Sequence, residues 1–371
     1  MLDLTVNHEV LESTVNFCRE KGITLPTFGM MRDPRLVPES VKTVLAATGL
    51  WDVHPANLYR VTWKNEPKEH GGLFGGVNHI VLPSELTGCP ANVLVLLGRY
   101  FPTGAHKVGA TFGCLVPRLI TGQFNPLTTK AVWPSTGNFC RGGAYISALL
   151  HCQAIAILPE GMSRERFEWL SKIAGEVIAT AGCESNVKEI FDKCWELRAS
   201  GQTLMIFNQF EELGNPLWHY VVTGSAAEEA LRSHLKPDDR VAGFVGSSGS
   251  AGTLGAGYFL KTKFPGAKLA VAEALQCPTL LMNGFGDHRI EGIGDKHVPW
   301  VHDCRNTDFV IAVDDEAPMR LIRLFNEGMG REALVAAGVP RDVAGRLDLL
   351  GISGLANLIA AVKFAKYLEL T

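Results

Sequence analysis

From Asn78 onward the chain alternates short apolar runs with longer segments whose apolar residues recur at helical spacing. The first series contains predicted strands at 131–133, 154–158, 176–180 and 203–207, with predicted helices at 110–121, 139–150, 164–175 and 186–199. Continuous apolar strands are typical of a parallel sheet that is buried on both faces, and the helices between them suit βαβ crossovers. The pattern predicts a doubly wound α/β unit.

The alternation starts again at Arg240. Further strands are predicted at 240–246, 268–274 and 308–313, with glycine-containing loops and a helix from Thr253 between them. A second doubly wound unit is therefore expected, and the predicted fold class is α/β with two parallel-sheet domains. Ligands bind such sheets at the carboxyl ends of the strands, so we expect these loops to face a shared cleft.

Residues 1–75 carry a weaker pattern, with helix-like stretches at 9–21 and 38–48. The second stretch has a proline at its start and Gly49 just past its end, as helices commonly do. We assign this segment only a packing role. No linker rich in proline or serine divides the chain, so the domain boundary is expected inside a crossover near 210–216.

Composition narrows the class of protein. A chain of 371 residues, with 46% hydrophobic and 20% charged residues, is long enough for two compact domains. The net charge of -3 gives no reason to expect nucleic acid or an anionic membrane as a partner. No stretch approaches the roughly 20 apolar residues of a membrane span, and the start of the chain lacks the features of a signal peptide.

The nine cysteines are scattered and include no CxxC pair, which argues against a zinc or redox motif. We expect reduced thiols, mostly in the core, and therefore a cytoplasmic protein. No spacing of histidine and cysteine suggests a metal site.

Lys107 is the first candidate for chemistry. It lies in PTGAHKVGA, between an apolar run and a helix-like segment. A lysine that packing shields from water has a lowered pKa, and its free amine can form a Schiff base with an aldehyde. The alternative is a solvated lysine near a helix start without a chemical role.

The stretch GSSGSAGT, residues 246–253, follows a strand and opens a helix. Its small residues let backbone N–H groups approach a phosphate, and its hydroxyls can donate hydrogen bonds. It lacks the lysine of a nucleotide-binding P-loop and the GxGxxG of a dinucleotide site. A phosphate site is favoured over a plain tight turn.

Two further turns begin helices. The turn PSTGN, residues 134–138, could bind a small carboxylate through its free N–H groups, or Ser135 or Thr136 could simply cap the next helix. In GISGLAN, residues 351–357, Ser353 is by default an N-cap, but its hydroxyl could also hydrogen-bond a heterocyclic nitrogen.

Together these groups suit pyridoxal 5'-phosphate bound to an amino acid. The chain resembles the fold-type II pyridoxal-phosphate enzymes, in particular the cysteine synthase and cystathionine β-synthase family, over about four-fifths of its length. The motifs that carry the resemblance are PTGAHKVGA, STGN, GMSRERFEWLSKIAG, NQFEELGNPLWHYVVTGSA, GSAGT, EGIGDK and GISGLAN. The lysine segment is closer to that of the tryptophan synthase β-subunit, whose two-domain fold is implied.

The resemblance implies a role for each motif. Lys107 forms the internal aldimine and acts as the general base, Asn138 binds the ring hydroxyl, and Ser353 faces the ring nitrogen. The substrate carboxylate is held by Ser135, Thr136, Gly137, Asn138 and Gln209. The phosphate is held by Gly249, Ser250, Ala251, Gly252 and Thr253. His106 contacts the phosphate or is a buried histidine, and the substrate side also includes Gly292, Asp295 and Lys296.

The implied reaction is β-elimination or β-replacement through an aminoacrylate, on serine, an O-activated serine, cysteine or a related small amino acid. A neutral serine at the ring nitrogen favours this chemistry over transamination. A serine or threonine deaminase is the alternative. A non-catalytic cofactor-binding subunit is a third possibility, because Phe139, Ala251 and Gly354 depart from the family pattern.

The resemblance also implies a homodimer and two domains. The larger, cofactor-binding domain is expected to comprise residues 1–106 and 213–371, with an N-terminal helical extension. The smaller is expected at 107–212, with the lysine and the carboxylate loop. Asp295 and Lys296 stand where small apolar residues are common, so they could read a polar substrate or form a surface ion pair.

Overall fold

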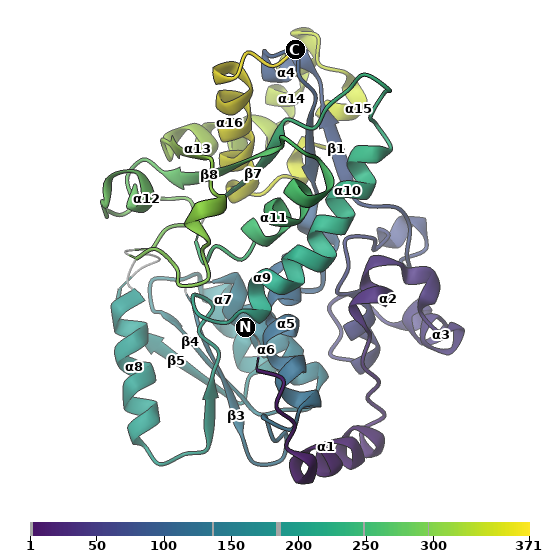
Figure 1. The fold of residues 1–371 in the computed structure, drawn as a ribbon, viewed down its shortest axis with the longest axis vertical. Helices are drawn as coiled ribbons and strands as arrows, with labels where there is room; N and C mark the ends of the chain where they lie inside the picture. The colour runs from purple at the N-terminus through teal and green to yellow at the C-terminus, as the bar shows by residue number, and fades with distance from the viewer. Residues whose placement is uncertain (1–2, 136, 183–186, 248, 296) are drawn as a thin grey trace. The chain divides into compact units, whose positions relative to one another are not determined.

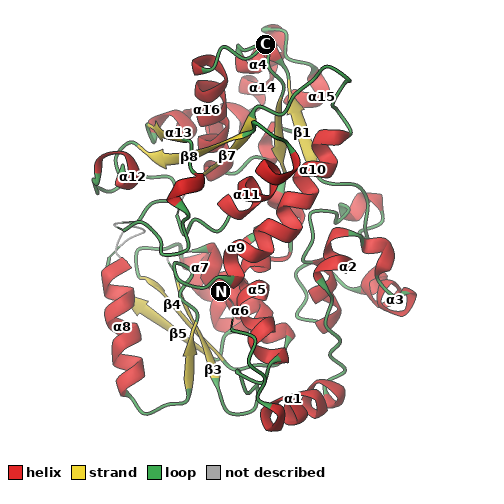
Figure 2. Cartoon of the chain, viewed as in Figure 1, coloured by secondary structure: helices red, strands yellow, loops and turns green. Residues whose placement is uncertain are grey.

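The computed structural model describes residues 3–135, 137–182, 187–247, 249–295 and 297–371, and it divides into two compact units (Figure 1). Unit 1 comprises residues 1–76 and 100–222, and unit 2 comprises residues 77–99 and 223–371. Helices alternate with strands in each unit (Figure 2). These bounds differ from the expected domains, because the first 76 residues belong with the unit that holds Lys107.

Unit 1 is built on a parallel sheet with the strand order β5-β4-β3-β6. Its strands are β3 (Lys130–Pro134), β4 (Ala154–Pro159), β5 (Glu176–Thr180) and β6 (Leu204–Ile206). Its main helices are α5 (Lys107–Ile120), α6 (Asn138–Leu149), α7 (Arg164–Ile173) and α8 (Val187–Ala199). The predicted strands and crossovers are confirmed. The central strand β4 is buried along its whole length, as its continuous apolar sequence requires.

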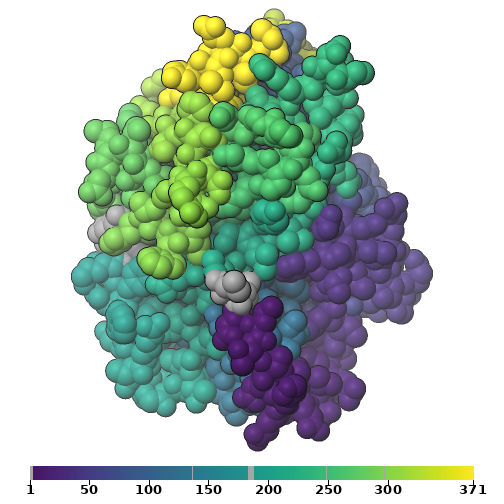
Figure 3. Space-filling model, viewed as in Figure 1, coloured from purple at the N-terminus to yellow at the C-terminus, as the bar shows by residue number. Residues whose placement is uncertain are grey.

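The N-terminal segment is part of unit 1 and forms a continuous stretch of its surface, coloured purple in the space-filling view (Figure 3). Its helices are α1 (His8–Glu20), α2 (Phe28–Arg32) and α3 (Glu39–Ala47), which confirms the two predicted helices. Long-range hydrogen bonds attach the segment. Asn7 N donates to Thr121 O at 2.8 Å, and Tyr145 Oη donates to Asp52 O at 2.8 Å.

Unit 2 contains a parallel sheet with the strand order β7-β8-β9 and an antiparallel pair, β1-β2. The strands are β1 (His79–Leu82), β2 (Val93–Leu96), β7 (Gly243–Ser247), β8 (Lys268–Ala274) and β9 (Phe309–Val313). The helices include α4 (Ser84–Thr87), α10 (Gly224–Arg232), α11 (Leu254–Lys263), α12 (Thr279–Met282), α13 (Glu316–Asn326), α14 (Gly328–Ala336), α15 (Arg341–Ala344) and α16 (Ile352–Tyr367). Ile80 and Leu82 of β1 share a core with Phe325, Leu347 and Leu355. This shared core explains why residues 77–99 belong with the C-terminal helices.

The chain passes from unit 1 to unit 2 along a helical stretch. It consists of α9 (Gly214–Trp218), a π-helical turn (His219–Thr223) and α10. The boundary lies between Val222 and Thr223, several residues beyond the expected crossover. Single π-helical turns are rare and frequently occur at functional sites.

The eight cysteines that the structure describes are all free, and most of them are buried. This agrees with the expectation of reduced core thiols. Within the described residues, no helix is long and apolar enough to cross a membrane.

Two helices of unit 1 approach each other through glycines. A Cβ atom on Gly113 of α5 would lie 2.4 Å from the carbonyl oxygen of Gly214 at the start of α9. A Cβ atom on Gly109 would lie 2.2 Å from the ring of Trp218. Because α5 begins at Lys107, this contact fixes the helix that carries the candidate lysine.

Replacing Gly113 with alanine should therefore destabilise unit 1. We expect Gly113→Ala to lower the free energy of unfolding by about 1–3 kcal/mol, because the backbones must move apart. Thermal and urea denaturation measure the change. Gly76→Ala is the control, since a Cβ atom there meets nothing within 4 Å. Equal stability of the two variants would contradict the close-packing argument.

Candidate active site

Lys107 is the first residue of α5, and its amine is held by a side chain from a distant part of unit 1. Lys107 Nζ donates a hydrogen bond to Gln209 Oε1 at 3.2 Å and lies 5.8 Å from the centroid of the Phe139 ring. The preceding turn has left-handed backbone at Thr103 (φ 65°) and Gly104 (φ 68°), so the chain bends sharply before the lysine. The lysine is thus fixed at a strained turn.

A chain of hydrogen bonds extends from Lys107 to the predicted carboxylate loop. Gln209 Nε2 donates to Ser135 Oγ at 3.3 Å, and Gly137 N donates to the same oxygen at 3.1 Å. Asn215 Nδ2 donates to the carbonyl of Gln209 at 3.0 Å and orients its backbone. The structure therefore brings together four predicted residues from three different stretches of sequence, namely Lys107, Ser135, Gly137 and Gln209.

The surroundings of Lys107 favour its neutral amine. Burial lowers the pKa of Lys107 to about 8, and Cys114 opposes the shift only in part. The N-terminal end of a helix also disfavours a positive charge. A larger fraction of the amine is consequently unprotonated at neutral pH than for an ordinary lysine.

Two histidines lie beside the lysine. The ring of His106 stacks on Trp63, with centroids 5.8 Å apart, and meets the ring of His219 edge-on at 5.0 Å. Burial, and then the charge of Lys107, lowers the pKa of His106 to about 3, and burial holds the pKa of His219 well below its usual range. Both rings are neutral at pH 7. A phosphate contact by His106 stays a prediction, and His219 was not anticipated.

The turn after β3 leads directly into α6. The N-cap of α6 is Gly137, and among the described residues no side chain caps this helix. Ser135 accepts from Gly137 N, upstream of the helix, so the alternative that Ser135 is the N-cap is wrong. Asn138 is the first helical residue, and Thr136 lies outside the described residues. Among the described residues, no side chain takes up the N–H groups of the first turn, which are the groups that an anion at this turn would use.

The predicted phosphate loop connects β7 to α11 in unit 2. Ser250 and Ala251 are buried, and Thr253 is the N-cap of α11, with its hydroxyl 3.4 Å from Ser247 O. A Cβ atom on Gly249 would lie 3.0 Å from the carbonyl oxygen of Gly292, so a larger residue here would press on that backbone. Gly252 lies between Ala251 and the cap. The loop has the small residues and helix start of a phosphate site.

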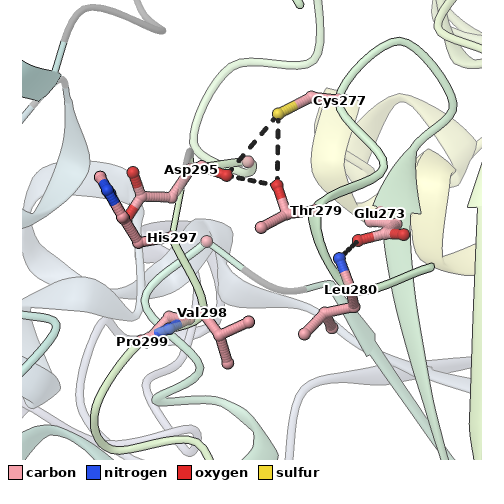
Figure 4. A pocket seen from close by; sticks show the side chains of 10 residues that line it. Glu273, Cys277, Thr279, Leu280, Asp295, His297, Val298 and Pro299 are labelled. Carbon is pink, nitrogen blue, oxygen red and sulfur yellow. Dashed lines mark hydrogen bonds between the residues drawn. The ribbon is translucent and has the colours of Figure 1, made fainter. Parts of the chain in front are cut away.

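A pocket adjoins this loop (Figure 4). It is lined by Gly249, Glu273, Cys277, Thr279, Leu280, Gly294, Asp295, His297, Val298 and Pro299. Asp295 is buried there, and its carbonyl accepts hydrogen bonds from Thr279 Oγ1 and Cys277 Sγ. Lys296 lies outside the described residues. A substrate contact by Asp295 stays a prediction.

Glu273 was not anticipated from the sequence. It is the penultimate residue of β8, is buried, and accepts hydrogen bonds from Leu280 N and Leu281 N at 3.0 Å each. Burial raises its pKa. An acidic residue at the end of an otherwise apolar strand was the signal that could have identified it.

Ser353 lies in the first turn of α16, where Gly351 is the N-cap. The expectation that Ser353 caps this helix is therefore wrong. Asn357, one turn further along, accepts a hydrogen bond from Ser247 Oγ at the end of β7. The start of α16 thus lies beside the beginning of the phosphate loop, within the same unit.

Comparison with known proteins agrees with these features. The family model described as "Pyridoxal-phosphate dependent enzyme" matches residues 80–351. A cysteine synthase of Staphylococcus aureus (strain N315) is 27% identical over 297 residues, which are 80% of this chain and 88% of the relative.

Solved structures share the fold. A hydrogen sulfide-producing enzyme from Fusobacterium nucleatum has a TM-score of 0.67 at 23% identity, covering 79% of this chain and 90% of the other. An O-acetylserine dependent cystathionine beta-synthase from Helicobacter pylori has a TM-score of 0.66 at 24% identity, covering 79% of this chain and 88% of the other.

The reactivity of Lys107 should follow its lowered pKa. The amine must lose a proton before it can attack an aldehyde, so we expect cofactor-free protein to take up pyridoxal phosphate faster as pH rises, with a midpoint near pH 8. Stopped-flow absorbance measures the rate. Nα-acetyl-lysine, with a pKa near ~10.4, is the reference compound. A protein midpoint equal to that of the reference would show that burial does not tune this amine.

Ala251 should tolerate only small replacements. Its φ of 58° is left-handed, where a β-branched residue is strongly disfavoured. We expect Ala251→Val to lose about 1–3 kcal/mol of stability and to release pyridoxal phosphate more readily. Ala251→Gly, which fits the same backbone, should keep the cofactor. Thermal denaturation and cofactor retention on dialysis measure both effects, and wild-type retention by the valine variant would contradict the argument.

Proposed function

This chain belongs to the family of pyridoxal-phosphate-dependent enzymes, and from that premise we propose that it catalyses β-elimination or β-replacement on a small amino acid. The observation that carries the proposal is the amine of Lys107, whose pKa is lowered to about 8 and which is hydrogen-bonded to Gln209. An amine with these properties can bind the cofactor aldehyde and can later accept a proton.

Unit 1 contains the proposed base and the proposed carboxylate loop. In unit 1, Lys107 binds the cofactor and moves the α-proton, while the N–H groups and hydroxyl around Ser135 and Gly137 hold the substrate carboxylate. Gln209 orients both, because it hydrogen-bonds Lys107 and Ser135. Asn138, at the start of α6, binds the ring hydroxyl.

In unit 2, the loop from Gly249 to Thr253 holds the phosphate, and Ser353 faces the ring nitrogen. When bound, pyridoxal phosphate supplies an aldehyde and an electron-withdrawing ring. A neutral serine hydroxyl does not force protonation of that ring, which favours loss of a β-substituent over transamination. Asp295 and Lys296 are proposed to contact the substrate beyond its α-carbon.

Several observations support a substrate of the serine or cysteine class. The curated relative from Staphylococcus aureus is a cysteine synthase, and one structural neighbour is an O-acetylserine dependent cystathionine beta-synthase. The departures from the family pattern remove no group that the proposal needs. Phe139 packs under the Lys107 amine and edge-on against Trp133, and Ala251 fits its loop. These contacts weigh against a non-catalytic subunit.

We further propose that the enzyme acts in the cytoplasm as a homodimer. The free, mostly buried cysteines among the described residues suit a reducing compartment. The dimer rests on the family resemblance, and light scattering of the purified protein tests it.

Lys107→Ala should abolish turnover. We expect the variant to lose the visible absorbance of the lysine-bound cofactor and to process no amino acid, because no other group replaces the amine. Lys130→Ala is the matched control, since Lys130 also donates to a glutamine oxygen, on Gln202 at 2.9 Å, but on the surface. The assay uses serine, O-acetylserine, cysteine and threonine, and a fully active Lys107→Ala enzyme would sink the mechanism.

The products distinguish β-replacement from elimination. Incorporation of an added thiol into the amino acid identifies β-replacement. Stoichiometric keto acid and ammonia, without thiol incorporation, identify elimination and select the deaminase. If wild-type protein binds the cofactor but exchanges no α-proton of any amino acid, the non-catalytic subunit is correct.

A further inference from the structure

Arg141 lies in the first turns of α6 and is held between two indole rings. Its guanidinium carbon is 5.5 Å from the ring centroid of Trp51 and 5.2 Å from that of Trp169. The two indoles meet edge-on, with centroids 5.8 Å apart and planes at 88°. Trp51 belongs to the N-terminal segment, outside the residues 80–351 that the family model matches.

Arg141 contacts no hydrogen-bond acceptor among the described residues. Within the described part of the chain, no hydrogen bond or ion pair reaches its guanidinium, and its Nε is buried without a partner. Burial lowers the pKa of Arg141, the nearby charge of Arg166 lowers it further, and Glu165 opposes both. A partly buried guanidinium without a hydrogen-bonded anion is unfavourable, and the repulsion from Arg166 is offset by Glu165 only in part.

The second cation lies against the proposed carboxylate loop. Arg166 Nη1 is 3.6 Å from the position that a Cβ atom on Gly137 would take. Both guanidiniums also act on the thiol of Cys140, whose pKa they lower against the larger effect of burial. Arg166 Nη1 therefore lies beside Gly137, four residues before Arg141 at the start of α6.

The N-terminal segment fixes the indole that faces them. The ring of Trp51 lies 3.4 Å from the Cβ position of Gly104, three residues before Lys107. Tyr145, one turn beyond Arg141, stacks on Trp169 with centroids 6.3 Å apart and donates to Asp52 O at 2.8 Å. Trp51 keeps 44% of its surface exposed, so the group has an open side.

We propose that Arg141, walled by Trp51 and Trp169, is an oxyanion-binding site for a phosphate or carboxylate group, and that the positive charge of nearby Arg166 adds to its attraction for an anion. An arginine stacked on aromatic faces still presents the N–H groups at its planar edge, and these match a phosphate or carboxylate in a bidentate manner. The group is carried by the amino-acid substrate or is a free oxyanion. Only the first source rests on the proposed function.

Titration of the holoenzyme with inorganic phosphate tests the site without turnover. Bound pyridoxal phosphate occupies the phosphate loop, and quenching of tryptophan fluorescence reports binding near Trp51 and Trp169. We expect saturable quenching in the wild-type protein and about tenfold or more weaker binding in Arg141→Gln. Arg198→Gln is the matched control, because Arg198 lies 4.7 Å from the exposed ring of Trp195 and should bind as wild type.

A purely structural role for Arg141 predicts that every variant that folds binds phosphate with the same affinity as the wild type. Arg141→Lys keeps the charge but loses the bidentate edge, so we expect it to fold and to bind phosphate with intermediate affinity. Circular dichroism checks that each variant is folded. Absence of saturable quenching in the wild type, or equal affinity in folded Arg141→Gln, overturns the site.

Kinetics with two different substrates distinguish the two sources of the oxyanion. If the group belongs to the substrate, Arg141→Gln should lower kcat/KM for O-phosphoserine about tenfold, mainly through KM, and leave that for neutral O-acetylserine unchanged. If phosphate binds but both substrates respond alike, the ligand is a free oxyanion. If no amino acid is turned over, the proposed function fails while the phosphate titration still decides the site.

Discussion

The burial of the Lys107 amine is the constraint that organises unit 1. A protonated ammonium there would lose hydration, would sit at the unfavourable end of a helix dipole, and would be repelled by any charged histidine nearby. The surroundings avoid these costs with neutral rings at His106 and His219, whose pKa values burial lowers. Gln209 can accept a hydrogen bond from either protonation state of the lysine, and Ser135 fixes it. The amine is thus available near neutral pH without being left unpaired.

Local pattern predicted much of the fold but less of the site. The parallel strands and the glycine turns are encoded within a few residues, so the sequence identified them directly. Lys107 and Gln209 are 102 positions apart, and only the resemblance joined them. His219 and Glu273 depend on packing between distant segments, which no local pattern reports. The cap of α16 was assigned to Ser353 by residue type, whereas the backbone selects Gly351.

The phosphate loop shows how a departure from a family pattern can be accommodated. Left-handed backbone at Ala251 costs about 1–2 kcal/mol relative to glycine. Its methyl group is buried with Leu254, Leu269 and Val271, and burying a group of this size returns about 0.8 kcal/mol. Burial thus offsets roughly half of the backbone cost, which leaves about 0.2–1.2 kcal/mol and makes alanine tolerable there. At Gly249 an added Cβ atom would lie only 3.0 Å from the carbonyl oxygen of Gly292, so the backbone would have to shift slightly to admit alanine.

The N-terminal segment changes the chemistry of the unit on which it packs. Without it, Arg141 would have one indole and an open side, and water could solvate its charge. With Trp51 in place the guanidinium is half-buried, and each indole contact contributes only about 1 kcal/mol. That is less than the cost of desolvating a guanidinium that has no hydrogen-bonded anion, and Glu165 offsets the repulsion from Arg166 only in part. The two aromatic contacts therefore do not balance the burial of Arg141, and an oxyanion is the group that would.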